Sequence, residues 1–191
     1  MSMIEQQLSR CMKSNYSISD LKDIEEKINY LLGIPEHEIF GDAYPVAKYY
    51  HALSMLYAQK DVKTSAKKCL LNAVKIADED TCIEDLYGTI FNDICGYEDN
   101  TSLKLKYVNR ALKIFETLRK EGREYSQNSY AMSLFNAAII LMELNQYREA
   151  LEKAEKALFI WKRLYMLEND KQLVNYISEA DRLTKFLKNR I

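Results

Sequence analysis

The chain has 191 residues, with 27 Lys and Arg against 28 Asp and Glu, and a formal net charge of −1. That balance argues against a dedicated nucleic-acid-binding domain, which would present a strongly basic surface. Only two prolines and five glycines are present, whereas average usage would give roughly 9 and 13. The chain therefore lacks the residues that end strands and form hairpins, and the composition predicts an all-helical protein.

Two short helices are expected at the N-terminus. Residues 2–13 form the first, and Ser17 or Ser19 can cap the second, whose apolar residues recur at helical spacing. Gly33 is placed to end this second helix. The stretch IPEHEIFGDAYP, which starts at residue 34, is the longest irregular one. It is predicted to join the N-terminal pair to the rest of the chain.

Seven further helices follow from the same apolar periodicity. The last of them places Leu173, Ala180 and Leu187 opposite a charged face, which is typical of a helix that caps a stack. A turn is expected at Leu144–Gln146. The predicted helices span about 44–60, 62–78, 81–96, 101–120, 126–144, 146–165 and 170–189.

Alanine recurs in a regular pattern. The segments NAVKIA, RALKIF and KALFIW put Ala73, Ala111 and Ala157 in one register, 38 and 46 residues apart. Ala66 and Ala150 precede the first and the last of them by seven residues. Helix backbones approach to ~8 Å only where the side chains between them are small. These alanines are therefore predicted contact points between stacked helices.

These small and large positions resemble those of the tetratricopeptide repeat, a unit of two antiparallel helices. The unit at 131–165 matches best, the unit at 47–76 matches well, and the middle unit matches poorly in its first helix. Repeats longer than the standard ~34 residues resemble the kinesin-light-chain-like branch of the family. The resemblance implies an α-solenoid of about eight or nine helices in one continuous domain. An N-terminal pair and joint would occupy 1–42, three helix pairs 43–165, and a capping helix 166–191.

In that family the first helix of each pair lines a concave groove. Methionine and other apolar side chains in such a groove suit an apolar or amphipathic peptide. An alternative is that Phe135, Ile139 and Met142 are covered by the first or last helix. Clamping of a carboxylate, as in heat-shock co-chaperones, is not expected, because only Asn136 is a suitable polar group. By resemblance, the groove residues are Lys48, His51, Met55, Asp93, Met132, Phe135, Asn136, Ile139 and Met142.

Charge is unevenly distributed along the chain. From Ala77 to Leu103 there are eight acidic residues and no Lys or Arg, whereas the next helix is strongly basic. Two interpretations remain open. The two segments are matched, solvated faces of neighbouring helices, or the acidic side chains line the groove and favour a cationic partner.

Catalytic, metal and cofactor sites find little support. The four cysteines occur singly, without metal-ligand spacing, and are expected to be reduced thiols in a cytoplasmic protein. No glycine-rich phosphate loop is present, and neither histidine has a recognisable Ser or Cys partner. The N-terminus does not resemble a signal peptide, and no run approaches the ~18 apolar residues of a membrane helix. We expect a non-enzymatic chain with no cofactor, metal, nucleic-acid or membrane partner.

The sequence thus predicts a module that holds a peptide or an extended segment of another protein. Alternatives are a peptide-sensing or response-regulator-binding regulator, a small secretion-type chaperone, and self-association through the end helices. The bias toward tyrosine, lysine, isoleucine and asparagine is typical of an AT-rich bacterial genome.

Overall fold

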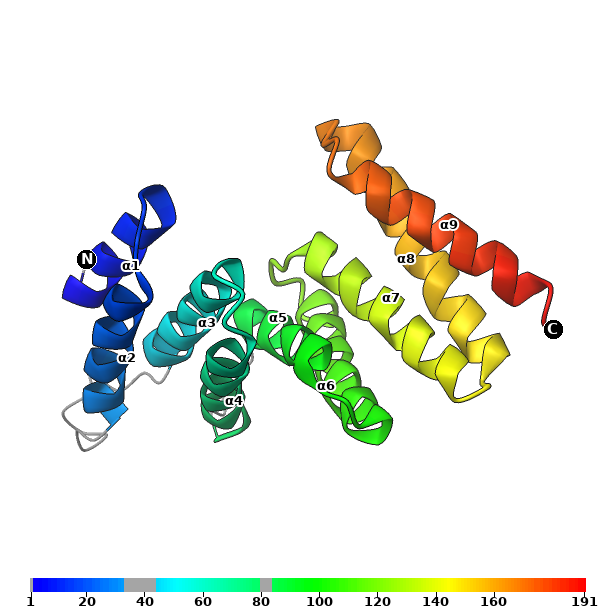
Figure 1. Cartoon of the computed structure of the whole chain (residues 1–191). Coiled ribbons are helices and arrows are strands. Elements are labelled where there is room, and N and C mark those ends of the chain that lie inside the picture. Colours follow the sequence, from blue (N-terminus) through cyan, green and yellow to red (C-terminus); the bar gives the residue numbers. More distant parts are fainter. Residues whose placement is uncertain (1, 33–43, 80–83) are drawn as a thin grey trace. The chain divides into compact units, whose positions relative to one another are not determined.

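The computed structural model describes residues 2–32, 44–79 and 84–191, and within these ranges every regular element is a helix (Figure 1). This confirms the predicted all-α fold of antiparallel helix pairs. Gly33, most of the predicted joint after it, and residues 81–83 lie outside the described residues. The elements are α1 (Met3–Lys13), α2 (Ile18–Leu32), α3 (Tyr44–Gln59), α4 (Lys63–Glu79), α5 (Asp85–Ile94), the 3-10 helix η1 (Cys95–Tyr97), α6 (Thr101–Lys120), α7 (Gln127–Glu143), α8 (Tyr147–Glu168) and α9 (Leu173–Lys188).

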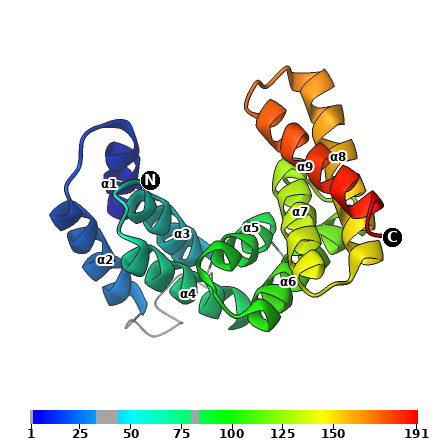
Figure 2. The same cartoon turned by 45° about the vertical axis from the view of Figure 1, so that its right-hand side comes forward.

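The helices form two compact units, Met1–Cys82 (unit 1) and Ile83–Ile191 (unit 2). In unit 1, α3 and α4 pair with each other, and α1 and α2 pack on α3 (Figure 2). The predicted domain boundaries after residues 42 and 165 remain predictions.

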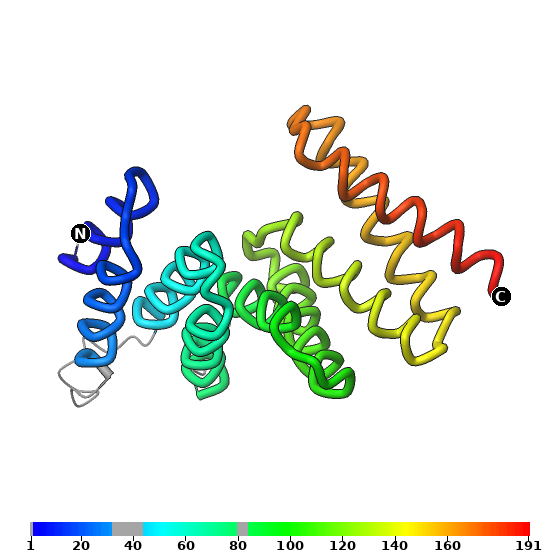
Figure 3. Tube along the Cα trace, viewed as in Figure 1, coloured from blue at the N-terminus to red at the C-terminus, as the bar shows by residue number. Residues whose placement is uncertain are grey.

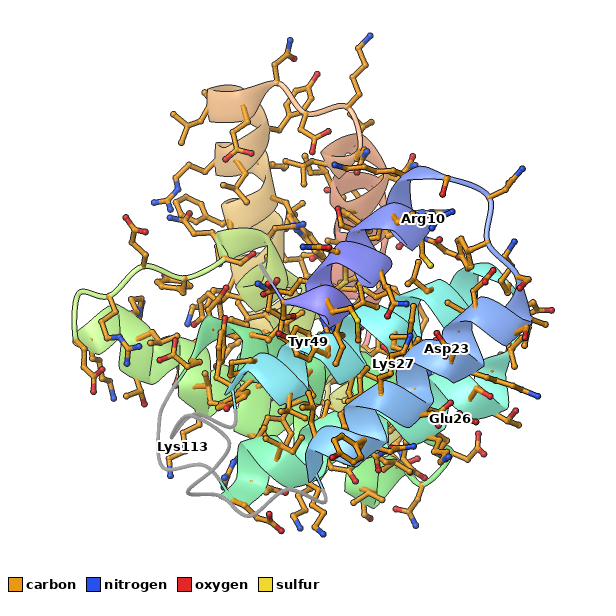
Figure 4. The ribbon with its side chains drawn as sticks, turned by 90° about the vertical axis from the view of Figure 1, so that its left-hand side faces the viewer. Arg10, Asp23, Glu26, Lys27, Tyr49 and Lys113 are labelled. Atoms are coloured by element: carbon orange, nitrogen blue, oxygen red, sulfur yellow. The ribbon has the colours of Figure 1, made fainter. Side chains whose placement is uncertain are left out.

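Side chains at the N-termini of α1 and α2 account for where these helices begin. Ser2 and Glu5 form a reciprocal capping box at the start of α1. Of the two serines proposed to cap α2, Ser17 does so: its hydroxyl accepts from the Asp20 amide at 3.2 Å, and the Asp20 carboxylate accepts from the Ser17 amide at 2.8 Å. Further along α2, Lys27 pairs with Asp23 one turn earlier at 2.6 Å (Figure 4).

A buried carboxylate ties three helices of unit 1 together. Glu25 of α2 is only 9% exposed, and it accepts hydrogen bonds from the Tyr57 hydroxyl of α3 at 2.9 Å and the Lys68 ammonium of α4 at 2.8 Å. Burial, together with the Glu25 carboxylate, raises the pKa of Tyr57 above its usual value. The phenol therefore stays protonated and keeps donating to Glu25.

In unit 2 each helix packs against the next, and α5 also contacts α7 (Figure 3). The α7–α8 turn contains Asn145 in a left-handed conformation (φ 60), and the Gln146 amide donates to the Leu141 carbonyl at 2.9 Å. The α3–α4 turn of unit 1 has the same form. Asp61 is left-handed there (φ 57), and the Val62 amide donates to the Tyr57 carbonyl at 3.0 Å. Two helix pairs thus turn identically at equivalent positions of the alanine register.

The recurring alanines are buried, which is consistent with their predicted place between stacked helices. Ala73, Ala111 and Ala157, which share the predicted register, are all completely inaccessible to solvent. Their small size lets the backbones of adjacent helices approach closely. In unit 2 one core cluster draws on α7, α8 and α9. It comprises Ala138, Leu141, Ala150, Ala154 and Leu187, with Leu105, Met142, Tyr147, Leu151 and Leu183 packed against it.

The boundary between α8 and α9 differs from the prediction. Helix α8 runs to Glu168 rather than to Tyr165, and α9 starts at Leu173 rather than near Asp170. Asn169 ends α8 in a left-handed conformation (φ 52), with its amide bonded to the Tyr165 carbonyl at 2.9 Å. Periodicity alone did not locate this end, because Tyr165, Met166 and Leu167 form a continuous, exposed apolar run without helical spacing.

The buried thiols predict an alkaline loss of stability. Cys69 and Cys95 are both buried, and burial raises the pKa of each to about 12. The unfolded thiols titrate near 9, so between pH 9 and 12 the unfolded state binds fewer protons than the folded state and stability falls as pH rises. Urea unfolding followed by circular dichroism from pH 8 to pH 10 is expected to show this decline. In the Cys69→Ala/Cys95→Ala variant, the free energy of unfolding should fall less steeply with pH. An unchanged slope in the double variant would contradict the assignment to these thiols.

Candidate functional site

A stripe of half-buried side chains runs along α7. Met132, Phe135, Asn136 and Ile139 are related by spacings of three and four residues, which places them on one face of the helix. All four are partly exposed, whereas the intervening Ser133, Leu134, Ala137 and Ala138 are buried. The structure thus brings four of the predicted groove residues together on one surface, which we call the α7 stripe.

Amide side chains connect the α7 stripe to α5. The Asn136 side-chain amide donates to Asn92 Oδ1 at 2.9 Å, and the Asn92 amide donates to Asp93 Oδ1 at 3.3 Å. The predicted residue Asp93 therefore lies beside the stripe. Asn92 was not among the predicted site residues, although the sequence held a signal for it. It stands 38 residues after Ser54 and 46 before Ala138, at the small position of the alanine register.

Phe135 of the α7 stripe packs against an aromatic cluster of α8 and α9. Its ring meets the Trp161 ring of α8 edge-on at 5.6 Å, and Tyr176 of α9 stacks on the same indole at 5.2 Å. The Trp161 indole N–H donates to Asn128 Oδ1 at 2.8 Å. Phe135 is therefore anchored by a buried ring from α8 while remaining partly exposed itself. Rigid placement of this kind limits the ordering cost of binding.

The remaining predicted residues have different surroundings. Met142 is partly buried against the core cluster of α7, α8 and α9. Lys48 is exposed, Met55 is 47% exposed and His51 is buried on α3 of unit 1. That these three share one groove with the residues of unit 2 remains a prediction.

The acidic and basic segments of unit 2 meet at one end of it. Arg123, after α6, pairs with Glu84 at 3.3 Å. The Asp85 carboxylate accepts from the Ser126 amide at 3.0 Å, just before α7. This supports matched neighbouring faces at this end of the unit. Asp93, by contrast, lies beside the α7 stripe. This position agrees with the other interpretation, in which acidic side chains line the groove.

Within the described ranges, no three His, Cys, Asp or Glu side chains gather in a way that could hold a metal ion. No helix in those ranges combines the length and the apolar character needed to cross a membrane.

Comparison with known proteins identifies relatives for part of the chain. No family model matches it. Over 136 residues it is 30% identical to the clustered mitochondria protein homologs of Emericella nidulans, Aspergillus niger and Aspergillus terreus, covering 67% of this chain. The matched part makes up 10% of those proteins, so the chain spans about a tenth of the length of these relatives. They are fungal proteins and give no support to the predicted bacterial origin.

A solved structure shares the fold. The crystal structure of BtubC (BKLC) from P. vanneervenii matches with a TM-score of 0.57 and 15% identity, covering 100% of this chain and 91% of that one. At this level of identity the match shows the fold alone. Together with the helix pairs described above, it places the chain among helical repeat proteins.

Proposed function

We propose that the chain is a non-catalytic protein-interaction module built from tetratricopeptide-like helix pairs, and that the α7 stripe binds an extended segment of another protein. The α7 stripe itself is the observation on which the proposal rests. Met132, Phe135 and Ile139 keep part of their apolar surface in water on one face of a helix. Covering such surface is favourable by roughly 25 cal/mol per Å².

The polar groups beside the stripe suit a polypeptide. Asn136 already donates one hydrogen bond to Asn92. A side-chain amide has two donor hydrogens and an acceptor oxygen, so it can also bind a main-chain group of a partner. The carboxylate of Asp93 would favour a basic side chain nearby. Methionine at the end of the stripe adapts its shape at little cost.

The comparisons support this proposal without testing it. The matched segment is a small part of much longer clustered mitochondria protein homologs, which is what an interaction module within a larger protein would look like. In the part of the chain that the structure describes, the fold shared with BtubC (BKLC) is built from helices. Paired helices in a row offer extended surfaces, and repeat proteins use such surfaces for binding.

The test compares capture of partners from a native lysate by two double variants. Met132→Arg/Ile139→Arg places charge on the α7 stripe and is expected to lose at least about tenfold in captured partner, because an unpaired charge would be buried on binding. Leu144→Arg/Val174→Arg is the control, since both side chains are apolar and partly exposed but lie off the stripe. It should capture as much partner as the unmodified chain, as measured by quantitative mass spectrometry.

Two results would contradict the proposal. One is equal capture by both double variants, and the other is equal loss in both while circular dichroism shows each to be folded. Phe135→Ala adds a further check. If capture is unchanged while the melting temperature falls sharply, Phe135 serves the core rather than the binding surface.

A further inference from the structure

The exposed side of α6 carries a row of cations. Lys106, Lys113 and Lys120 are all exposed and follow at seven-residue intervals. Seven residues make two turns, so neighbouring members of the row are about 10.5 Å apart along the helix axis. None of the three forms an ion pair with any residue that the structure describes. Figure 4 shows the Lys113 side chain pointing away from its helix.

The exposed side of α8 carries a matching apolar row. Phe159 is 67% exposed and Met166 is 84% exposed, again seven residues apart. Lys162 and Arg163 lie between them in the sequence and are exposed as well. Single exposed apolar residues are ordinary. Two large ones aligned on one helix face and flanked by cations are more typical of an interaction site.

The two rows belong to neighbouring helices. Lys156 of α8 reaches Glu116 of α6 at 3.9 Å, and its ammonium lies over the Tyr130 ring at 5.1 Å from the centroid. Both helices run antiparallel to α7, which packs against each of them (Figure 3). Glu116 is the only acidic residue in the sequence of α6, and Lys156 already pairs with it. A cationic row and an apolar row therefore run in the same direction on one surface.

We infer that this α6–α8 surface binds an acidic amphipathic helix of a partner protein. Carboxylates seven residues apart on such a helix are spaced as Lys113 and Lys120 are. Apolar side chains on the adjacent flank, with the same repeat, would cover Phe159 and Met166. The charges would speed and orient the encounter, and the apolar contacts would slow dissociation. This surface is separate from the α7 stripe, and the inference does not depend on the proposed function.

Two other anionic occupants fit less well. A membrane is a broad plane, and Glu149 and Glu152 are also exposed on α8, so an anionic bilayer would meet repulsion beside the cationic row. Single-stranded nucleic acid is usually held by several aromatic platforms. The exposed aromatic side chains of α8 are Phe159 and Tyr165, and a spacing of six residues places them on different sides of the helix. A helix is narrow enough to contact the two rows alone.

The test uses a synthetic fluorescein-labelled helical peptide with Glu at seven-residue intervals on one flank and Leu on the next. A peptide with Lys in place of Glu is the matched control. Fluorescence anisotropy is expected to show binding of the acidic peptide only, weakening as salt rises. Lys113→Glu/Lys120→Glu should weaken binding at least about tenfold, and Phe159→Ser at least about threefold. Lys13→Glu/Lys22→Glu changes two exposed lysines of unit 1 by the same charge and should leave the affinity unchanged.

Every other outcome overturns the inference. These are failure of the acidic peptide to bind, equal weakening by the two charge-reversed double variants, or tighter binding of phosphatidylserine-containing vesicles or of polyuridylate than of the peptide. Circular dichroism checks that each variant is folded, which is expected because all the substituted side chains are exposed. The Met132→Arg/Ile139→Arg variant should bind the acidic peptide normally, so failure here and failure of the proposed function can be told apart.

Discussion

Replacing Trp161 with alanine is expected to destabilise unit 2 by about 3–5 kcal/mol, as is usual when a large aromatic side chain is removed from a core. The indole is completely buried, with Phe135 against its edge and Tyr176 stacked on it at 5.2 Å. Its N–H also donates to Asn128 at 2.8 Å. One substitution would thus open a cavity between α7, α8 and α9. A domain stability of about 5–15 kcal/mol leaves little margin for that loss.

Urea unfolding followed by far-ultraviolet circular dichroism measures the effect, because Trp161 is the only tryptophan and cannot serve as a fluorescent probe in its own absence. Phe159→Ala is the matched control on the same helix. That ring is 67% exposed, and its loss should change stability by no more than ~0.5 kcal/mol. If Trp161→Ala costs less than about 1 kcal/mol, these three rings are not part of the core of unit 2.

Gly88→Ala is expected to destabilise unit 2 by a net 1–2 kcal/mol or so, even though alanine is the better helix former. A Cβ at Gly88 would lie 2.6 Å from the tip of the Phe115 ring. That ring is fully buried and held between Tyr130, at 5.9 Å, and Tyr125, at 6.3 Å. Overpacking of this kind costs about 1–3 kcal/mol. The gain from replacing glycine within a helix is only about 0.5–1 kcal/mol.

Two further variants isolate the clash. Gly96→Ala is the control, because a Cβ there meets nothing within 4 Å, so stability should not fall. Phe115→Leu in the Gly88→Ala background should recover part of the loss relative to the sum of the single changes, a coupling that a double-mutant cycle measures. Additive losses would show that the methyl group and the ring do not compete for space.

Helix positions were predictable because their causes are local. The bounds predicted for α6, 101–120, are those observed, Thr101–Lys120. Asn100 accepts from the Leu103 amide at 2.9 Å, and Gly122 takes a left-handed conformation (φ 68) after the helix. An N-cap residue, an apolar stripe and a glycine after the last turn can all be recognised within about twenty residues of sequence. The same holds for the α7–α8 turn around Asn145.

The candidate site was only partly predictable. Met132, Phe135, Asn136 and Ile139 share a helix face by spacing alone, so the α7 stripe could be predicted from the sequence. The contribution of α5 was harder to predict, because Asn92 stands at the position of the alanine register that the small residues Ser54 and Ala138 occupy in the other two helix pairs. Asn92 contributes to the site only because it accepts a hydrogen bond from Asn136, which is 44 residues away in the sequence.

By itself the sequence determined the fold class, the order and approximate extent of the helices, and the small residues at which they pack. These follow from propensity, periodicity and capping within a few turns of chain. Only the tertiary structure decided which distant side chains meet. Glu25 reaches Tyr57 and Lys68 across 32 and 43 residues, and Trp161 meets Asn128 across 33. The reason is geometric: such contacts depend on how far apart two helices lie and how each is rotated, which the spacing of residues along one helix does not specify.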